Sequence, residues 1–428
     1  MKVHLQMLGC RLNQSEIDMM ARQFEQQGHT ITDNPAEAEQ IIVNTCAVTN
    51  EATRSSRKLI RELNRANQSA EITVTGCYAQ IQPSEIAVID GVQRVVGNAE
   101  KDSIVTQITG IEPEPFDLEP HARDRSSGFA ARTRAFIKVQ DGCDNSCTFC
   151  ITTVARGAGQ SRSADDIINE IQYLHQELDY QEAVLTGVHL GSYGHDLGNR
   201  AGLLELVARI LDETDIPRVR LSSLEPWDLA EGFFDLWQNP RVQPHLHLPL
   251  QSGCDATLKR MRRNTSQVEF RALMQAAREK IPNVRITSDV IVGFPGETDE
   301  EWQESKAFIE EMDFDGLHAF RYSVREGTPA ARMRGKVPNA IKKERIHNLI
   351  TWASEQETRF ATRYVGQLMP VLWEHVSGSS EAGFLQAGYT DNYIRVQATH
   401  PRVLTNLITS ARIDCVIDGV AHVTPVIE

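Results

Sequence analysis

The sequence predicts an α/β protein in three parts. These are an amino-terminal parallel α/β domain (residues 1–115), a central partial (β/α)6 TIM-like barrel (130–360) and a small carboxy-terminal antiparallel β-barrel of OB-like size (363–428). The first hundred residues alternate apolar runs with helical stretches, and six further units of this kind follow. From Gly366 onward, short alternating runs are broken by Gly, Ser and Asn, which is typical of a small barrel.

Composition excludes several classes of protein. The 428 residues carry 44 Lys and Arg against 58 Asp and Glu, and a net charge of −14 argues against binding nucleic acid through the overall field. No apolar run reaches the 18 residues of a membrane span, and the amino terminus lacks the pattern of a signal peptide. We therefore expect a soluble, cytoplasmic chain without a membrane partner. In that compartment, eight cysteines are more typical of metal ligands or catalytic groups than of disulfides.

The amino-terminal part holds one cysteine after each predicted strand. The strands are expected at Val3–Leu8, Gln40–Asn44 and Ile72–Thr75, and the helices at Gln14–Gln27, Glu51–Asn67 and Pro83–Ile89. Cys10, Cys46 and Cys77 fall in the loops that follow the three strands. Because the carboxyl ends of parallel strands share one edge of a sheet, these cysteines should converge. Buried packing is the alternative role for three small thiols.

A linker rich in proline, serine and charge is expected at 111–133. The strands of the barrel are then expected at Ala135–Gln140, Ala183–Thr186, Val219–Ser222, His245–Leu248, Ile286–Val292 and Leu317–Phe320. Right-handed crossovers between six such units imply a partial barrel with its chemistry at the carboxyl ends of the strands.

The strongest motif is DGCDNSCTFC, directly after the first barrel strand. Cys143, Cys147 and Cys150 have the spacing C-x3-C-x2-C, and no fourth cysteine or histidine lies nearby in the sequence. A structural zinc site usually has four protein ligands, so zinc is the weaker interpretation. Three thiolates on a four-iron cluster would leave one iron open to a substrate or cofactor. Cys254 and Cys415 remain, and for both we predict a packing role.

This motif, with Phe149 before its last cysteine, resembles the signature of radical S-adenosylmethionine (SAM) enzymes. The resemblance implies that Cys143, Cys147 and Cys150 are the catalytic ligands of a [4Fe-4S] cluster whose open iron binds SAM. Reductive cleavage of SAM would then give a 5'-deoxyadenosyl radical that abstracts hydrogen from an unreactive C–H bond. It also implies an electron donor such as flavodoxin or ferredoxin.

Further motifs resemble one family of such enzymes over nearly the whole chain. LGCRLNQSE, NTCAVTNEA and TGCYAQ are similar to the amino-terminal domain of methylthiotransferases, in which three cysteines hold a second [4Fe-4S] cluster. By this resemblance Cys10, Cys46 and Cys77 are metal ligands, and a sulfur donor is required. HLPLQSG, GFPGET, YSVREGTPAARM and GYTDNY follow in family order, and GYTDNY lies in a segment similar to a TRAM RNA-binding domain.

The resemblance also places SAM at the strand ends of the barrel. The residues expected to bind it are Phe149, Thr186, Gly187, Glu225, Gln251 and Asp289. Each of the strand-end residues has an alternative role as a turn or cap residue. His189, His245 and His247 lie near the same mouth, where a strand histidine is more often a core group than a ligand.

Methylthiotransferases differ mainly in their target, and the motifs here favour threonylcarbamoyladenosine in the tRNA anticodon stem-loop. Arg11-Leu12-Asn13 after Cys10 and LTGVHLGSYG are similar to that branch. Thr153, and Arg321 before Tyr322-Ser323, depart from prolines common in the family. The alternatives are isopentenyladenosine in tRNA and an aspartate of a ribosomal protein. An alternative of another class is a non-catalytic iron-sulfur RNA-binding protein, which would need no SAM pocket.

Basic surfaces that bind RNA are expected outside the terminal barrel, because residues 363–428 have a net charge of −2. They are 321–346, the second helix (Arg54, Arg57, Lys58, Arg61 and Arg65) and the segment Lys259, Arg260, Arg262 and Arg263. A solvated helix face is the alternative for each. Arginines expected near the mouth of the barrel, where a substrate carboxylate would need a cation, are Arg11, Arg156, Arg162, Arg321 and Arg325.

Overall fold

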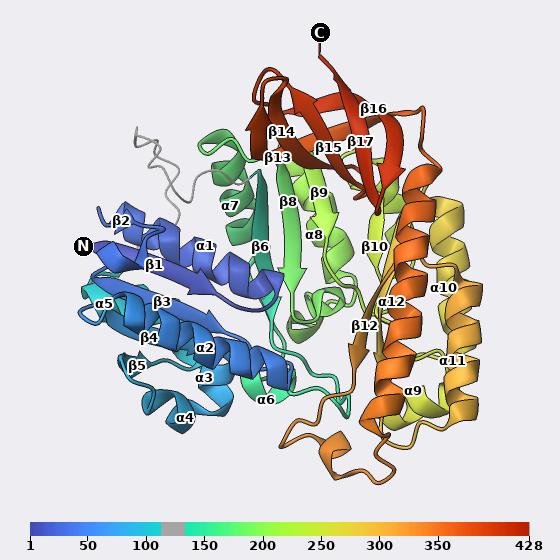
Figure 1. The fold of residues 1–428 in the computed structure, drawn as a ribbon, viewed down its shortest axis with the longest axis horizontal. Coiled ribbons are helices and arrows are strands. Elements are labelled where there is room, and N and C mark those ends of the chain that lie inside the picture. The colour runs from blue at the N-terminus through green and yellow to red at the C-terminus, as the bar shows by residue number, and fades with distance from the viewer. Residues whose placement is uncertain (113–132, 428) are drawn as a thin grey trace.

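The structure is a computed structural model that describes residues 1–112 and 133–427. It confirms the α/β class, with a parallel sheet, a partial barrel and a closed β-barrel in that order (Figure 1). The predicted linker lies outside the described residues from 113 to 132. Among the described helices, none combines the length and the apolarity needed to cross a membrane.

The amino-terminal sheet has the order β2-β1-β3-β4-β5, and all its neighbouring strands are parallel. Its strands are β1 (Lys2–Met7), β2 (Thr30–Ile31), β3 (Gln40–Thr45), β4 (Glu71–Gly76) and β5 (Val92–Val95). Its helices are α1 (Arg11–Gln26), α2 (Asn50–Ala66), α3 (Cys77–Ile81), α4 (Pro83–Ala87) and α5 (Ile104–Thr109). Every residue of β3 is buried, as expected for the central strand of a sheet covered on both faces.

One helix begins earlier than the sequence predicts, and another is preceded by an additional short helix. α1 starts at Arg11 rather than Gln14, so that Cys10 is its amino-terminal cap. The helix expected from Pro83 is preceded by the short α3, and the chain breaks between them at Gln82, because the residue before a proline is disfavoured in helical conformation. Both differences place a cysteine at the start of a helix.

Six parallel strands form the open central barrel. They are β6 (Arg134–Asp141), β8 (Glu182–Gly187), β9 (Arg218–Leu221), β10 (His245–His247), β11 (Arg285–Val292) and β12 (Gly316–Arg321). Two isolated parallel bridges, Val219 with Val242 and Ser223 with His247, join the sheet that contains β6, β8 and β9 to the sheet that contains β10, β11 and β12. The short β7 (Gln160–Ser161) pairs antiparallel with β6.

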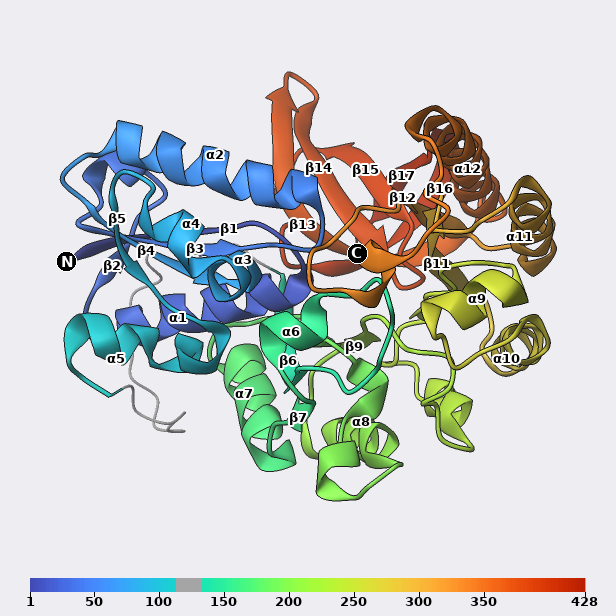
Figure 2. The same cartoon turned by 90° about the horizontal axis from the view of Figure 1, so that it is seen from below.

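Helices surround this barrel on the outside (Figure 2). They are α6 (Thr152–Arg156), α7 (Ala164–Gln176), α8 (Gly202–Glu213), α9 (Asp255–Met261), α10 (Gln267–Lys280), α11 (Asp299–Met312) and α12 (Asn339–Thr362). Apolar residues of α7, α8, α10, α11 and α12 pack on the strands in one large core. Between β9 and β10 the crossover has the 3-10 helix Phe233–Gln238 in place of a long helix.

The last five strands form a closed barrel in the order β13-β14-β15-β17-β16. They are β13 (Leu368–Ser380), β14 (Gly383–Thr390), β15 (Arg395–His400), β16 (Ile408–Ile417) and β17 (Val420–Val426). All pairs are antiparallel except β15 with β17. Figure 1 shows this barrel at the amino ends of the central strands, opposite the loop that carries the C-x3-C-x2-C motif.

The turn between β14 and β15 inserts into the central barrel. The Tyr393 hydroxyl accepts hydrogen bonds from Arg11 (3.0 Å) and Arg134 (2.9 Å). Its ring stacks on Tyr389 at 4.7 Å, and the guanidinium of Arg220 lies 4.6 Å from its centre. Burial would raise the pKa of Tyr393, but the nearby arginines lower it below its ordinary value. The tyrosine that ends the GYTDNY motif (Gly388–Tyr393) therefore contacts other parts of this chain.

Candidate active site

The first cysteine trio lies at the carboxyl edge of the amino-terminal sheet. Cys10 caps α1 directly after β1, Cys46 follows β3, and Cys77 is the first residue of α3 after β4. Because β1, β3 and β4 are adjacent and parallel, these ends meet at one edge. Burial raises the pKa of the Cys46 thiol, and Cys77 and Cys10 lie near enough to raise it further. The structure thus brings the three sequence-distant cysteines together.

Two glycines allow this close approach. Gly9 has φ +127°, and a Cβ there would lie 3.1 Å from the Cβ of Cys46. Gly76 has φ +97°, and a Cβ there would lie 2.3 Å from the carbonyl oxygen of Thr45. A side chain at either position would strain the backbone and push two cysteine loops apart.

The second trio lies in the loop between β6 and α6, at the carboxyl end of the first barrel strand. Cys143, Cys147 and Cys150 are each half-buried. The amides of Asn145 and Thr152 each point at a cysteine sulfur, at 3.4 Å from Cys143 and Cys150 respectively. Hydrogen bonds of this kind favour the thiolate, which is the form that binds metal.

Two ion pairs flank this loop. His189 lies 3.8 Å from the sulfur of Cys143, and its Nε2 is 2.5 Å from an oxygen of Asp228. Burial would lower the pKa of His189, but the hydrogen bonds to Asp228 and Cys143 raise it to about 10. Nε2 of the ring is thus held by Asp228, while Nδ1 lies near Cys143 and the side-chain amide of Asn145. The three thiols of this loop fit a four-iron cluster with one open iron.

The other flanking pair connects to Cys147. Arg263 approaches the sulfur of Cys147 at 3.7 Å and binds the carboxylate of Glu225 at 2.5 Å. Burial raises the pKa of Cys147 to about 11, although the guanidinium opposes this rise. Arg263, which we expected on an RNA-binding surface, is buried at 7% exposure, so that expectation is wrong. Counting charges along the sequence could not show that Arg263 is buried against Glu225.

A cavity of about 610 Å³ joins all three parts of the chain. It reaches from the first cysteine loop through the barrel interior to the terminal barrel. Its lining includes Cys10, Arg11, Thr186, Gly187, Ser222, Ser223, His245, His247, Thr287, Asp289, His318, Glu357, Tyr389, Tyr393 and Arg395. The barrel side of this wall is almost wholly polar, which is unusual for a barrel interior filled by core side chains.

The residues predicted to bind SAM divide between two places. Thr186, Gly187 and Asp289 line the cavity. Phe149 packs edge-on against Phe294 at 6.5 Å, in a small apolar cluster beside the second trio. Glu225 also lies near the second trio, because it binds Arg263, which contacts the sulfur of Cys147.

Gln251 adopts φ +71° and pairs with Val290 of β11 in an isolated parallel bridge. Its role as a SAM contact stays a prediction, as do those of the other five residues.

Contacts between the two cysteine loops could not be found from the sequence. Arg156, at the end of α6, donates to Glu16 (2.9 Å) and to Asn13 (2.9 Å) on α1. Asn13 is also 3.7 Å from the sulfur of Cys10. On the other side, Asn98 donates to the carbonyl of Ala155 at 2.7 Å and lies 4.0 Å from the sulfur of Cys77. These contacts tie the helix that follows the second trio to residues beside Cys10 and Cys77 of the first.

Several other basic residues are not free to bind a substrate. Arg156 already donates hydrogen bonds to Glu16 and Asn13. Arg162 donates to Glu170 and to the carbonyl of Lys138. In 321–346, Lys342 and Arg345 are buried. Arg325 binds the loop after Cys46 through the carbonyl of Val48 and the side chain of Asn50. These placements overturn the expectation that Arg156 and Arg162 are available to a carboxylate.

The two remaining cysteines differ. Cys254 is 1% exposed and packs as predicted. Cys415 is exposed, so its predicted packing role is wrong. It lies in β16, where alternate side chains face solvent.

A solved structure shares this fold. The radical S-adenosylmethionine methyltransferase TsrM from Kitasatospora setae, solved with cobalamin and a [4Fe-4S] cluster bound, superposes with a TM-score of 0.57 at 17% identity. The superposition covers 77% of this chain and 77% of that one. At this identity the likeness concerns the fold alone.

Sequence comparison is more specific. Residues 2–97 match the family described as Uncharacterized protein family UPF0004, and residues 137–309 match the Radical SAM superfamily. Threonylcarbamoyladenosine tRNA methylthiotransferase MtaB of Bacillus subtilis is 37% identical over 91% of this chain and 88% of its own length. A tRNA-2-methylthio-N(6)-dimethylallyladenosine synthase of Staphylococcus haemolyticus is 31% identical over 95% and 81%. With the two cysteine trios, these matches show that the chain is an enzyme of the radical SAM methylthiotransferase family.

Proposed function

We propose that this enzyme adds a methylthio group to carbon-2 of N6-threonylcarbamoyladenosine, next to the anticodon of tRNA. Relatives named for this reaction match nearly the whole chain. The structural observation that carries the choice of substrate is the polar wall of the cavity beside Cys10.

The N6 substituents of the two tRNA substrates need different pockets. The threonylcarbamoyl group bears a carboxylate, a hydroxyl and a urea, whereas the isopentenyl group is an apolar alkene. On the barrel side, the cavity is lined by Ser222, whose buried hydroxyl has no hydrogen-bond partner among the described residues, and by Ser223. An apolar substituent would leave these groups without partners, which costs much more than a missing apolar contact.

A cation for the carboxylate is also present. Arg395 lines the cavity on β15 and is exposed, and its guanidinium makes no hydrogen bond or ion pair among residues 1–112 and 133–427. By contrast, Arg11 already donates to Tyr393. Arg395 is therefore the guanidinium that we assign to the substrate carboxylate, because such pairs are strong and directional.

Two [4Fe-4S] clusters and SAM supply the radical and sulfur-transfer chemistry when they are bound. We assign Cys143, Cys147 and Cys150 to the cluster that binds SAM, and Cys10, Cys46 and Cys77 to the other. The chain's own residues fix the loops: amides point at two of the sulfurs, and the Arg156 and Asn98 contacts hold the two loops together. Phe149 and its apolar neighbours exclude water beside the second trio.

Partners follow from the same proposal. We expect the anticodon stem-loop to contact the exposed basic residues after β12, which are Arg321, Arg332, Arg334 and Lys336, and those of α2, which include Arg54, Arg61 and Arg65. An electron donor such as flavodoxin or ferredoxin and a sulfur donor are also required, and the cytoplasm is the expected location. The boundaries 1–115, 130–360 and 363–428 stay our division of the chain.

Mass spectrometry of tRNA nucleosides tests the substrate. A strain that lacks this gene should lose the methylthio form of threonylcarbamoyladenosine and accumulate the unmodified nucleoside. The methylthio form of isopentenyladenosine should be intact. The wild-type gene on a plasmid should restore the product, and the Cys147→Ala gene, made at the same protein level, should not.

Two results would contradict the proposal. Loss of the isopentenyl product instead would assign the enzyme to that branch. An unchanged tRNA profile, with a ribosomal protein that loses a methylthio group, would assign it to the aspartate branch.

A further inference from the structure

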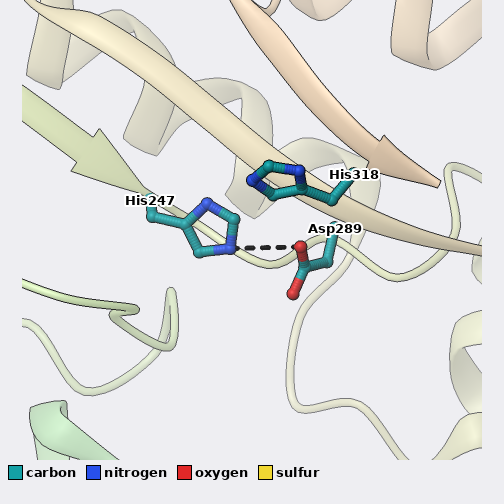
Figure 3. Close-up of side chains that lie close together, drawn as sticks. All are labelled: His247, Asp289 and His318. Carbon is teal, nitrogen blue, oxygen red and sulfur yellow. Dashed lines mark ion pairs between the residues drawn. The ribbon is translucent and has the colours of Figure 1, made fainter. Parts of the chain in front are cut away.

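Three side chains that line the cavity converge there, and one of them, Asp289, is also among the predicted SAM contacts (Figure 3). They are His247 on β10, Asp289 on β11 and His318 on β12. One ligand atom from each lies within 4.8 Å of the other two. Nε2 of His247 is 3.2 Å from an oxygen of Asp289, and the two imidazole rings are 5.6 Å apart between centres. Adjacent parallel strands in register place them side by side.

The three groups retain unused bonding capacity. In the part of the chain that the structure describes, the ring nitrogens of His318 have no hydrogen-bond partner, and the ion-pair partner of Asp289 is His247. The side chains of His247 and Asp289 are only 12% and 25% exposed, whereas His318 is exposed at the cavity wall. Partly buried polar groups that face a common space usually share a bound ligand or ordered water.

The residue behind His247 fixes the direction of its ring. The Thr287 hydroxyl is 2.9 Å from Nδ1 of His247, which leaves Nε2 facing Asp289 and the cavity. A hydrogen bond to the rear nitrogen is the usual way in which proteins orient an imidazole toward a metal. Thr287 is a residue of β11, is 7% exposed, and is the register partner of His247 on β10.

The surrounding charges permit a cation. Glu357 and Asp418 also line the cavity. Arg285 lines the cavity too, and its guanidinium is engaged with the carbonyl of Tyr393 and with Glu357 at 3.4 Å. Arg11 is bonded to the Tyr393 hydroxyl.

We propose that His247, Asp289 and His318 bind a divalent transition-metal ion of the zinc and iron(II) class. Two imidazoles and one carboxylate are the ligands that this class prefers, whereas magnesium and calcium prefer oxygen. Three protein ligands leave the remaining positions open to the cavity, as in sites that bind a further ligand. The site depends on neither cysteine trio and on no choice of tRNA substrate.

Zinc is the probe, because iron at this site would be hidden by the iron of the clusters. The enzyme is purified anaerobically with both clusters filled, so that the cysteines are already occupied. It is then incubated with Zn²⁺ and passed through a desalting column. We expect about one Zn²⁺ to remain per chain, bound by nitrogen and oxygen at about 2.0–2.2 Å in the X-ray absorption spectrum, without sulfur.

Variants assign the bound ion. Asp289→Asn and His318→Ala should lose the retained zinc, and Thr287→Val should weaken its binding by about 10- to 100-fold because it removes only the group behind His247. His375→Ala, which alters an exposed histidine of β13, should retain zinc like the wild type. Iron content and melting temperature are measured for every variant to show that the protein is folded and loaded.

Three results would overturn the proposal. They are a loaded wild type that retains no zinc, equal retention by Asp289→Asn and the wild type, and sulfur among the ligands. Loss of nucleoside binding in the variants without any zinc in the wild type would show that the three side chains contact the substrate directly. None of these results would alter the nucleoside profile on which the proposed function depends.

Discussion

Cys147→Ala should abolish the reductive cleavage of SAM, whereas Cys77→Ala should leave cleavage intact and remove the methylthio product. The first change takes one of three thiolates from the cluster with the open iron. The second damages only the cluster at the edge of the amino-terminal sheet. Both variants should lose about four irons per chain. The measurements are 5'-deoxyadenosine for cleavage, the methylthio nucleoside for product, and iron content.

The matched control is Cys254→Ala. This cysteine is also buried, at 1% exposure against 8% for Cys77, but it lies before α9, where its sulfur is 3.3 Å from Glu304 of α11. It should retain both clusters and both products. If Cys77→Ala still gave the methylthio nucleoside at the wild-type rate, the amino-terminal trio would have a structural role only.

Glu16→Gln should destabilise the protein by about 3–5 kcal/mol, because it leaves the buried Lys101 without its counter-charge and removes one of the two carboxylates, Glu16 and Asp141, that pair with Arg156. Glu16 is 1% exposed and binds Lys101 at 2.7 Å and Arg156 at 2.9 Å. The side chains of both partners are 2% exposed. Urea unfolding of the loaded enzyme, followed by fluorescence and by cluster absorbance, measures the loss.

The control for this substitution is Glu37→Gln, which removes one partner of an exposed pair with Lys2. Its side chain is 52% exposed, and solvent screening leaves such pairs with little effect on stability. Equal unfolding midpoints for the two variants would show that the buried network is dispensable.

The same network should respond to acid in one direction. Burial would raise the pKa of Glu16, but Lys101 and Arg156 hold it well below its ordinary value. A carboxylate whose folded pKa is depressed contributes stability above its unfolded pKa and loses it as the pH falls below that value. The difference in unfolding free energy between the wild type and Glu16→Gln should therefore shrink below about pH 4.3.

The cysteine chemistry could be predicted because it rests on local signals. A three-residue and a two-residue spacing after a strand define the second trio, and the parallel order of β1, β3 and β4 brings the first together. His318 could not be found in this way. A lone histidine in an alternating strand is usually a core residue, and its partners come from two other strands.

The contacts between the three parts of the chain could not be predicted from the sequence either. Arg156 and Glu16 are 140 positions apart, and Arg134 and Tyr393 are 259 apart. No periodicity relates such residues, because their contact depends on how separately folded parts dock. For the same reason a count of charges in 321–346 could not separate buried Arg345 from exposed Arg334.

The turn that carries Tyr393 makes the terminal barrel a wall of the reaction chamber as well as a separate module. Arg134 donates to the Tyr393 hydroxyl, Arg285 to its carbonyl, and Arg218 to the carbonyl of Pro370. A chain that ended after α12 would leave these guanidinium groups facing solvent at the floor of the barrel. Such a truncated enzyme would lose more than an RNA contact, because water would enter from beneath a chamber whose radical chemistry requires its exclusion.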